Sequence, residues 1–537
     1  MRSYGIWAVC AVVAVLLTLA YAVPYGAANQ ATYLLDPLHR AMPELFRRDW
    51  FVSETPPYLP VFGWLAKWLY VMDHEGVVAF VTAHIVVTLA SWAAVYWLVG
   101  AVGGGLRASV IVASIAALTM NLSMGGSYLI VGYVQPSSVA TLGWLVAIAA
   151  LVRDRYLVCG LSAAVAGLLH ANFLVLGVGL FGLASLARRD LGWRELACVM
   201  VPQLVVLACF LPQLLAAAGP SEHAVWILTH FHAPVHYDPT RMVGWIKEVV
   251  GWQIGGLAGL YLLGDSRPAR TLWRFSLVAA GTVTVTALVI RFTPLESLTQ
   301  VRWSRIAPFG QLACQVLMIA GLAQHVRAPR DLSTRARVLV GLGLVAPLYI
   351  TAYHIRMMVP LLAFHAGALA FVLVLTPWQR IARGAFTALA ISLFAFALWR
   401  SPRGEGLREP CAAPPRLREL VSWAREHTPA DSVFLVPPGV GQFRLLARRA
   451  VVVDAKSPPL RPDLLERWHA RLCDTVLNPD AQTFKAAAAS YAKLTPAQLE
   501  QVAHTYDADY IVVQGPADFA SPPVFNNGAY AIYRVSP

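Results

Sequence analysis

Charged side chains are scarce in this chain. Asp, Glu, Lys and Arg make up 13% of its 537 residues, whereas a typical soluble domain carries about 25%. Apolar residues make up 58% of the chain, and the mean hydropathy is +0.58. This composition excludes a soluble globular protein of this length and indicates that most of the chain lies in a lipid bilayer.

Motifs for nucleotide or zinc chemistry are also missing. Segment 437–441 follows a predicted strand, but it contains neither Gly-Lys-Ser/Thr nor Gly-x-Gly-x-x-Gly, so we interpret it as an ordinary loop. His232 and His236 enclose Pro234 without a glutamate between them, which excludes the zinc-protease pattern His-Glu-x-x-His. The net charge of +13 argues little for nucleic acid, because most arginines lie singly or in pairs in short loops.

Long apolar runs are present instead, and a run of about 20 residues crosses the hydrocarbon core as a helix. We predict spans at 5–23, 76–101, 108–121, 135–152, 156–169, 171–187, 195–218, 249–264, 274–292, 308–323, 336–352, 357–375 and 381–400. We interpret the first run as a retained helix, although it ends in Ala20-Tyr21-Ala22, a sequence that a signal peptidase could cleave.

Thirteen spans place the two termini on opposite sides of the membrane. Arginine-rich loops alternate along the chain, and such loops face the cytoplasm. The arginines that set this orientation are Arg107, Arg153, Arg155, Arg188, Arg189, Arg194, Arg267, Arg270, Arg274, Arg327, Arg330, Arg335, Arg337, Arg380 and Arg383. The N-terminus is therefore expected in the cytoplasm and the C-terminal domain outside.

The chain thus predicts an α-helical polytopic membrane protein with a C-terminal extracytoplasmic α/β domain. Residues 1–400 would form the transmembrane domain, with a first external loop at 24–75, and residues 401–410 are typical of a linker. Within 411–537 we expect helices at 417–426, 463–475 and 496–505, and strands at 432–436, 450–454, 510–513 and 530–535. Cys411 and Cys473 lie in this domain, where export would allow a disulfide.

The first external loop is longer than two neighbouring spans require. Its aromatic and apolar residues alternate with a few charges, which favours short helices on the membrane surface. These helices either brace the bundle or present an active carboxylate at a lipid-facing cavity. The candidate carboxylates are Asp36, Asp49 and Glu54.

Other polar residues gather on the same predicted face. Gln135-Pro136-Ser137-Ser138 begins a span, where free amides suggest a modest anion site. His170, at a turn between two spans, is either functional or bonded to the backbone. Arginines on the outer side would bind a lipid phosphate or reach anionic headgroups. The cationic candidates here are Arg302, Arg305, His354 and Arg356.

The densest cluster comprises His223, His230, His232, His236, Tyr237 and Asp238. Imidazoles two and four residues apart, followed by a carboxylate, suit a transition metal, a phosphate or structural hydrogen bonds. A metal at this face would use residues from the set Asp49, His232, His236 and Asp238.

The motifs Asp49-Trp50-Phe51, Gln135-Pro136-Ser137, His170, 232–239 and Gln300-Val301-Arg302 resemble a group of uncharacterised bacterial integral membrane proteins of GT-C type. The arrangement of spans, long first loop and exported α/β tail resembles the GT-C superfamily of glycosyltransferases, and the stretch from Tyr33 to Trp64 is similar to the first loop of its mannosyltransferase and aminoarabinose-transferase branch. This resemblance implies a bacterial inner-membrane protein with a membrane lipid partner, a polyprenyl-phosphate sugar donor and a glycan, lipid or protein acceptor.

The resemblance also implies an inverting displacement at the sugar's anomeric carbon, with the lipid phosphate as leaving group. Asp49 is the expected catalytic carboxylate, with Asp36, Glu54 and Asp238 as alternatives. A divalent cation (Mg or Mn), if the enzyme needs one, would be shared with the phosphate. The residues expected to bind the phosphate are His170, His232, His236, Tyr237, Arg302, Arg305, His354 and Arg356.

One position departs from the superfamily pattern. GT-C enzymes carry an acidic residue just after the first span, where this chain has Asn29-Gln30. Either Asp36 or Asp49 takes that role, or the chain does not transfer sugars by this route. The alternatives are a lipid or solute transporter or flippase, and a non-catalytic membrane protein of envelope assembly.

Overall fold

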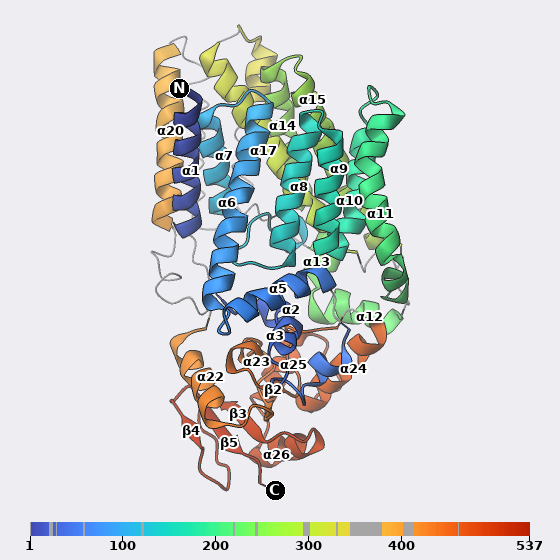
Figure 1. The fold of residues 1–537 in the computed structure, drawn as a ribbon, viewed down its shortest axis with the longest axis vertical. Helices are drawn as coiled ribbons and strands as arrows, with labels where there is room; N and C mark the ends of the chain where they lie inside the picture. The colour runs from blue at the N-terminus through green and yellow to red at the C-terminus, as the bar shows by residue number, and fades with distance from the viewer. Residues whose placement is uncertain are drawn as a thin grey trace.

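The computed structural model describes residues 2–20, 25–27, 29–56, 59–119, 123–217, 221–241, 245–293, 301–328, 331–343, 379–400, 413–459 and 461–536. A bundle of long helices occupies one end of an elongated molecule, and the C-terminal region, residues 413–536, occupies the other end (Figure 1). The N-terminus lies at the bundle's far end, remote from the C-terminus.

The bundle helices follow the predicted spans closely. They are α1 (Arg2–Ala20), α6 (Val77–Ala101), α7 (Leu106–Thr119), α8 (Pro136–Val152), α9 (Tyr156–Leu169), α10 (Ala171–Leu186), α11 (Trp193–Ala217), α14 (Trp245–Leu263), α15 (Arg267–Phe292), α17 (Ala307–Arg327) and α20 (Gln379–Arg400). In the described residues, four segments are long and apolar enough to cross a membrane: Val77–Ala101, Trp193–Leu215, Arg267–Phe292 and Trp303–Arg327. The chain is therefore an integral membrane protein. The predicted span 336–352 is described only to residue 343, and 357–375 lies outside the described residues.

Helix α15 begins earlier than predicted, at Arg267 rather than 274. Ser266 caps it by accepting from the Ala269 amide, and a proline occupies its first turn. The arginine-rich segment 267–274 is therefore helical, because the N-cap residue, and not the hydropathy, determines where the helix begins.

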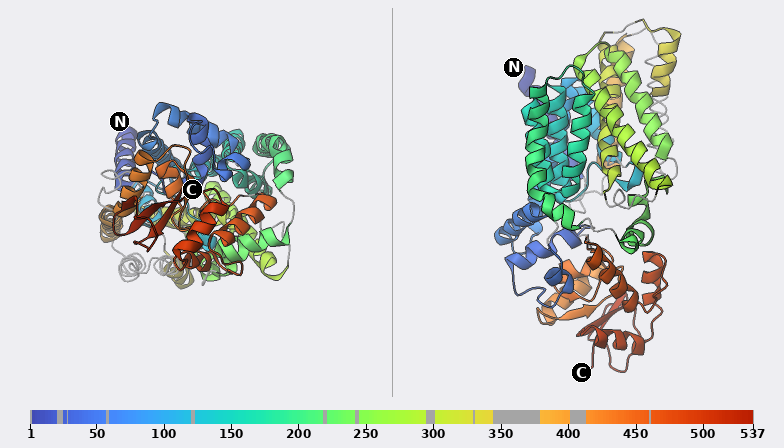
Figure 2. Two further views of the ribbon diagram at one scale, coloured as in Figure 1. Left: turned by 90° about the horizontal axis from the view of Figure 1, so that it is seen from below. Right: turned by 90° about the vertical axis from the view of Figure 1, so that its right-hand side faces the viewer.

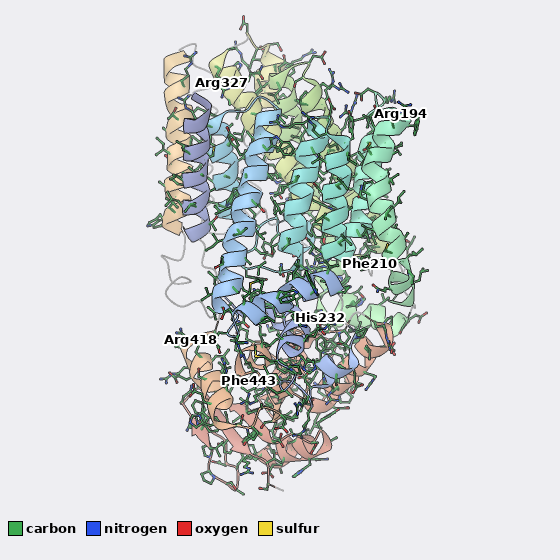
Figure 3. The ribbon with its side chains drawn as sticks, in the orientation of Figure 1. Arg194, Phe210, His232, Arg327, Arg418 and Phe443 are labelled. Carbon is green, nitrogen blue, oxygen red and sulfur yellow. The ribbon has the colours of Figure 1, made fainter. Side chains whose placement is uncertain are left out.

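The arginine-rich loops meet at one end of the bundle. The buried Arg188 lies 2.7 Å from Asp154 and 3.0 Å from Asp190, and Arg267 lies 2.8 Å from Asp190. Arg194 and Arg327 lie at this end, away from His232 (Figure 3). The loops predicted to share one side of the membrane thus contact one another.

Four short helices of the first external loop lie between the bundle and the C-terminal region (Figure 1): α2 (Gln30–Tyr33), α3 (Leu35–Ala41), α4 (Trp50–Glu54) and α5 (Pro60–Met72). Helix α5 buries Phe62 and Tyr70 but exposes Trp64, Trp68 and Met72. An exposed aromatic face on a helix at the end of the bundle suits the membrane interface, as the sequence predicted for this loop.

The C-terminal region contains a five-stranded sheet of order β2-β1-β3-β5-β4, formed by β1 (Val433–Leu435), β2 (Ala450–Val451), β3 (Tyr510–Gln514), β4 (Phe525–Asn526) and β5 (Tyr530–Arg534). Strand β1 pairs in parallel with β2 and β3, and β5 pairs antiparallel with β3 and β4. The helices of this region are α22 (Pro415–His427), α23 (Phe443–Ala447), α24 (Pro462–Thr475), α25 (Phe484–Tyr491) and α26 (Pro496–Thr505).

The two faces of this sheet pack against different partners. Phe434 of β1 packs in a core with Leu420 of α22, whereas Leu435 belongs to a second core that also contains Trp468 of α24. The second core continues through Phe51 of the first external loop. The C-terminal region is thus held to the bundle by a shared apolar core, and it covers the central part of the bundle's end (Figure 2).

Among the described residues, no disulfide involves Cys473. Cys473 is a buried free thiol whose Sγ lies 3.7 Å from His469 Nε2, and Cys411 lies outside the described residues. The alternating pattern of the sequence could not show this, because disulfide formation depends on the distance between the two residues in the fold.

Candidate functional site: a cationic cluster at the end of the bundle

Several short segments meet where the bundle contacts the C-terminal region: α2, η1 (Met124–Gly126), η2 (Ile227–His232), α13 (Pro234–Tyr237) and η4 (Trp303–Ile306). Gly125 and Gly126 both have positive φ, at 71° and 63°. A Cβ on Gly126 would lie 3.0 Å from His236 Cε1, so glycine allows this close approach.

Arg302 and Arg305 flank the start of the span that contains α17. The Nε atom of each is buried and has no hydrogen-bond partner. Among the described residues, neither arginine forms an ion pair with a carboxylate. The buried Ser304 lies between them and its hydroxyl lies 3.2 Å from Ser127 Oγ, which fixes the segment against the loop before α8.

The protonation of two neighbouring histidines follows from their hydrogen bonds. His236 Nδ1 donates to the Gly125 carbonyl at 2.6 Å, which leaves Nε2 of the neutral ring as an acceptor. His170 Nδ1 accepts from the Asn172 amide at 3.3 Å, so Nε2 carries the proton, and this buried donor has no partner. The cluster therefore offers both a donor and an acceptor beside its two arginines.

His232 joins the cluster from the end of η2. It bonds to the backbone of Ala455, and its Nδ1 is buried without a partner. Burial lowers the pKa of both His232 and His236 to about 4, and the charge of Arg302 acts on both in the same direction. Both rings are therefore neutral at pH 7. Tyr237 adds a phenol whose pKa burial raises, with Arg302 and Tyr33 close by.

The amides after the first span are structural. Gln30 Nε2 donates to the Val134 carbonyl at 2.9 Å, and Asn29 Nδ2 donates to Gln135 Oε1 at 3.1 Å. Gln135 and Ser138 form a capping box at the start of α8, in which each side chain accepts from the backbone amide of the other residue. These amides are therefore not free for the anion that the sequence analysis suggested at this helix start. Asn29 and Gln30 thus position the α8 entry loop next to the cationic cluster.

Asp49, the predicted catalytic carboxylate, lies in the shared apolar core. Its Oδ1 accepts from Val52 N and its Oδ2 from Val451 N, each at 3.1 Å, and Arg444 Nε lies 3.1 Å from Oδ2. Burial raises the pKa of Asp49, while the charge of Arg444 and the two amides oppose that rise. Both oxygens are occupied, and no contact joins Asp49 to the arginine and histidine cluster within the described residues.

Asp36 and Glu54 are placed differently. Asp36 lines a small cavity of about 40 Å³ with Tyr33, Phe51, Pro56 and Gly63, and it pairs with Arg40 at 2.9 Å. Tyr33 also lies close to Arg305, so one residue borders both the cavity and the cationic cluster. Glu54 is exposed and pairs with Arg467 at 2.7 Å.

The remaining candidates do not join the cluster. Asp238 accepts from the Thr240 amide and pairs with Arg241, which makes it a turn residue. No group of three or more His, Cys, Asp and Glu side chains in the described residues is placed to hold a metal ion, so Asp49, His232, His236 and Asp238 do not form a ligand set. His354 and Arg356 lie outside the described residues.

Sequence reasoning missed Arg444 and Lys456. Neither residue belongs to a motif that predicts a binding site: Arg444 lies between apolar residues, and Lys456 follows the predicted strand 450–454. The one available signal for Arg444 was an arginine among apolar neighbours, Phe443, Leu445 and Leu446. An arginine in that setting is buried only when it is paired.

A family model described as a domain of unknown function (DUF6798) matches residues 415–475. No curated protein matches the sequence.

Two solved structures of ArnT from Cupriavidus metallidurans are similar to this chain. The one bound to undecaprenyl phosphate is 13% identical, with 99% of this chain and 97% of that chain covered and a TM-score of 0.49. The apo form is 12% identical, with 99% and 98% covered and the same TM-score. At this identity they assign no residue role or reaction to this chain.

Proposed function

We propose that this protein is a membrane glycosyltransferase that moves a sugar from a polyprenyl-phosphate-linked donor to an acceptor at the end of the bundle that carries the C-terminal region. The observation that carries the proposal is the pair Arg302 and Arg305, whose buried Nε atoms have no partner. A guanidinium whose Nε is buried without a carboxylate partner is unfavourable, and its planar fork fits a phosphate.

The neighbouring groups suit the other parts of such a donor. The protonated Nε2 of His170 would donate to the phosphate. The free lone pairs of His232 Nδ1 and His236 Nε2 would accept from sugar hydroxyls. Arginines beside the leaving phosphate stabilise the charge that develops there during transfer.

The carboxylate best placed to act on an acceptor is Asp36, because it lines the cavity that Tyr33 connects to the cluster. In the transfer, the acceptor oxygen bonds to the anomeric carbon, the bond from that carbon to the phosphate oxygen breaks, and the acceptor proton passes to the carboxylate. Asp49 stays the alternative base, and a divalent cation shared with the phosphate stays part of the proposal.

The test is donor turnover by the full-length protein in lipid nanodiscs, with radiolabelled polyprenyl-phosphate sugars, with and without Mg or Mn. We expect Arg302→Gln and Arg305→Gln each to lower turnover by about 10²-fold or more, while Arg47→Gln, an exposed arginine of the same face, leaves it unchanged. Folded protein that turns over no donor would instead favour a transporter or an assembly protein.

The same assay separates the carboxylates. We expect Asp36→Asn to lower turnover by about 10²- to 10⁴-fold, the range for loss of a general base. Asp49→Asn should act mainly through stability, because both oxygens of Asp49 bind protein groups. The reverse ranking, with both variants folded, would make Asp49 the base.

A further inference from the structure

The C-terminal region reaches the cationic cluster through one tight turn, residues 454–457. Asp454 Oδ1 accepts from the amides of Lys456 and Ser457, at 2.7 Å and 2.9 Å, which closes the turn. Thr32 donates its hydroxyl to the Lys456 carbonyl at 2.7 Å, and His232 bonds to the backbone of Ala455. The turn is thus held between the first external loop and the histidine segment.

Lys456 is the exposed cation of this turn. Its charge interacts with that of Arg302 and also acts on His232. Within the described residues no carboxylate forms an ion pair with Lys456, Arg302 or Arg305. Three like charges close together repel one another, and a bound anion removes that repulsion.

The carboxylate nearest to Lys456 in sequence is already engaged. Asp454 Oδ2 lies 3.2 Å from Arg444 Nη1, and the same guanidinium lies 3.1 Å from Asp49. All three side chains are at most 1% exposed. Asp49, Arg444 and Asp454 therefore form a buried chain of charges that runs from the α4 cap to the 454–457 turn.

We propose that Lys456 is a phosphate-binding residue supplied by the C-terminal region, that it acts on the same anion as Arg302 and Arg305, and that Asp49, Arg444 and Asp454 are positioning residues for it. The anion that three cations favour is a lipid-borne phosphate, and they bind the doubly charged polyprenyl phosphate that leaves the donor more tightly than the singly charged phosphodiester of the donor itself. This inference rests on the proposed function and names a further part of its site.

The first measurement is the affinity of the full-length protein in nanodiscs for a fluorescent polyprenyl phosphate. We expect Lys456→Gln to weaken binding roughly 10- to 100-fold, as for loss of one charge-assisted contact, with an unchanged midpoint of thermal unfolding. Lys485→Gln, an exposed lysine of α25, is the matched control and should bind like wild type. The sugar donor, whose phosphodiester carries one charge, should bind more weakly than polyprenyl phosphate and lose less affinity in Lys456→Gln.

The positioning role has its own readout. Asp454→Asn should weaken phosphate binding, and the double variant with Lys456→Gln should bind no more weakly than Lys456→Gln alone, because Asp454 acts through Lys456. Asp49→Asn provides the same comparison if Asp454→Asn does not fold. Additive losses in both pairs would overturn the positioning role.

The outcomes also separate this inference from the proposed function. Wild-type affinity in Lys456→Gln, together with lost binding in Arg302→Gln, would overturn the inference and leave the arginine site standing. Lysine-dependent binding without turnover of any sugar donor would support the inference and overturn sugar transfer. Binding unaffected by either substitution would overturn both.

Discussion

Arginines occur in two settings in this structure. Arg444 is 1% exposed and neutralised by Asp49 and Asp454, whereas Arg302 and Arg305 have no carboxylate partner among the described residues. The paired arginine holds the structure together, and the unpaired ones are available to a ligand, because a buried charge is retained only where something neutralises it.

Removing the paired arginine should destabilise the protein strongly. Arg444→Met leaves two buried carboxylates without a cation, and we expect a loss of about 3–5 kcal/mol in the free energy of unfolding. Arg425→Met, which breaks a more exposed pair with Glu75, should cost about 0–1 kcal/mol. Unfolding of both variants in the same detergent measures the difference, and equal losses would contradict a stabilising role for the buried chain.

Acid should also destabilise the protein through His232 and His236. Both have a pKa of about 4 in the fold against 6.5 ordinarily. Between these values the unfolded chain binds protons that the folded rings do not, so the free energy of unfolding falls as pH falls from 6.5 to 4. Thermal unfolding across this range should show a shallower pH dependence in His236→Gln than in wild type or in His427→Gln, an exposed control.

Among the elements, the pair α14 and α17 depends on glycine. A Cβ on Gly259 would lie 2.3 Å from the Leu317 carbonyl carbon, and Gly321 faces the Gly259 carbonyl. Small residues let membrane helices approach this closely and gain dispersion contacts. The packing of this pair is therefore set by backbone contact.

Gly259→Ala should separate this helix pair and destabilise the bundle by about 1–3 kcal/mol, as overpacking does. Gly281→Ala on α15 is the control, because a Cβ there meets nothing within 4 Å. The midpoint of thermal unfolding in detergent should fall for the first variant only. Equal midpoints would show that the helices adjust without loss.

Elements were predictable where their pattern was long. The apolar helices and the helix α26 (Pro496–Thr505) lie where the sequence placed them. The short elements α23, α25 and β4 were missed, because five or eight residues, or a two-residue strand, give too few repeats of a period to recognise. The helices η2 and α13 were likewise expected as loop, since Pro234 interrupts their pattern.

For the whole molecule, the arginine-rich end and the C-terminal region lie at opposite ends (Figure 3). Sealed vesicles of known orientation test whether these ends face opposite sides of the membrane. Protease added outside right-side-out vesicles should cleave the C-terminal region and spare the 188–194 loop, and inverted vesicles should give the reverse. Cleavage of both from one side would contradict the expected topology.

The sequence by itself determined the bundle, its arginine-rich end and the candidate phosphate-binding residues. These follow from a local rule, since a bilayer demands runs of apolar residues and makes each charged exception conspicuous. Arg302, Arg305, His170, His232 and His236 were found in this way, and the structure brings them together.

Only the tertiary structure decided what the carboxylates do. Asp49 and Arg444 are almost 400 positions apart, and no periodicity relates residues at that distance. Their pairing depends on the apolar core that the first external loop shares with the C-terminal region. Asp36 lines a cavity and Asp49 is fully buried for the same reason: the neighbours that surround a side chain set its solvation and its partners, and packing brings them from distant parts of the chain.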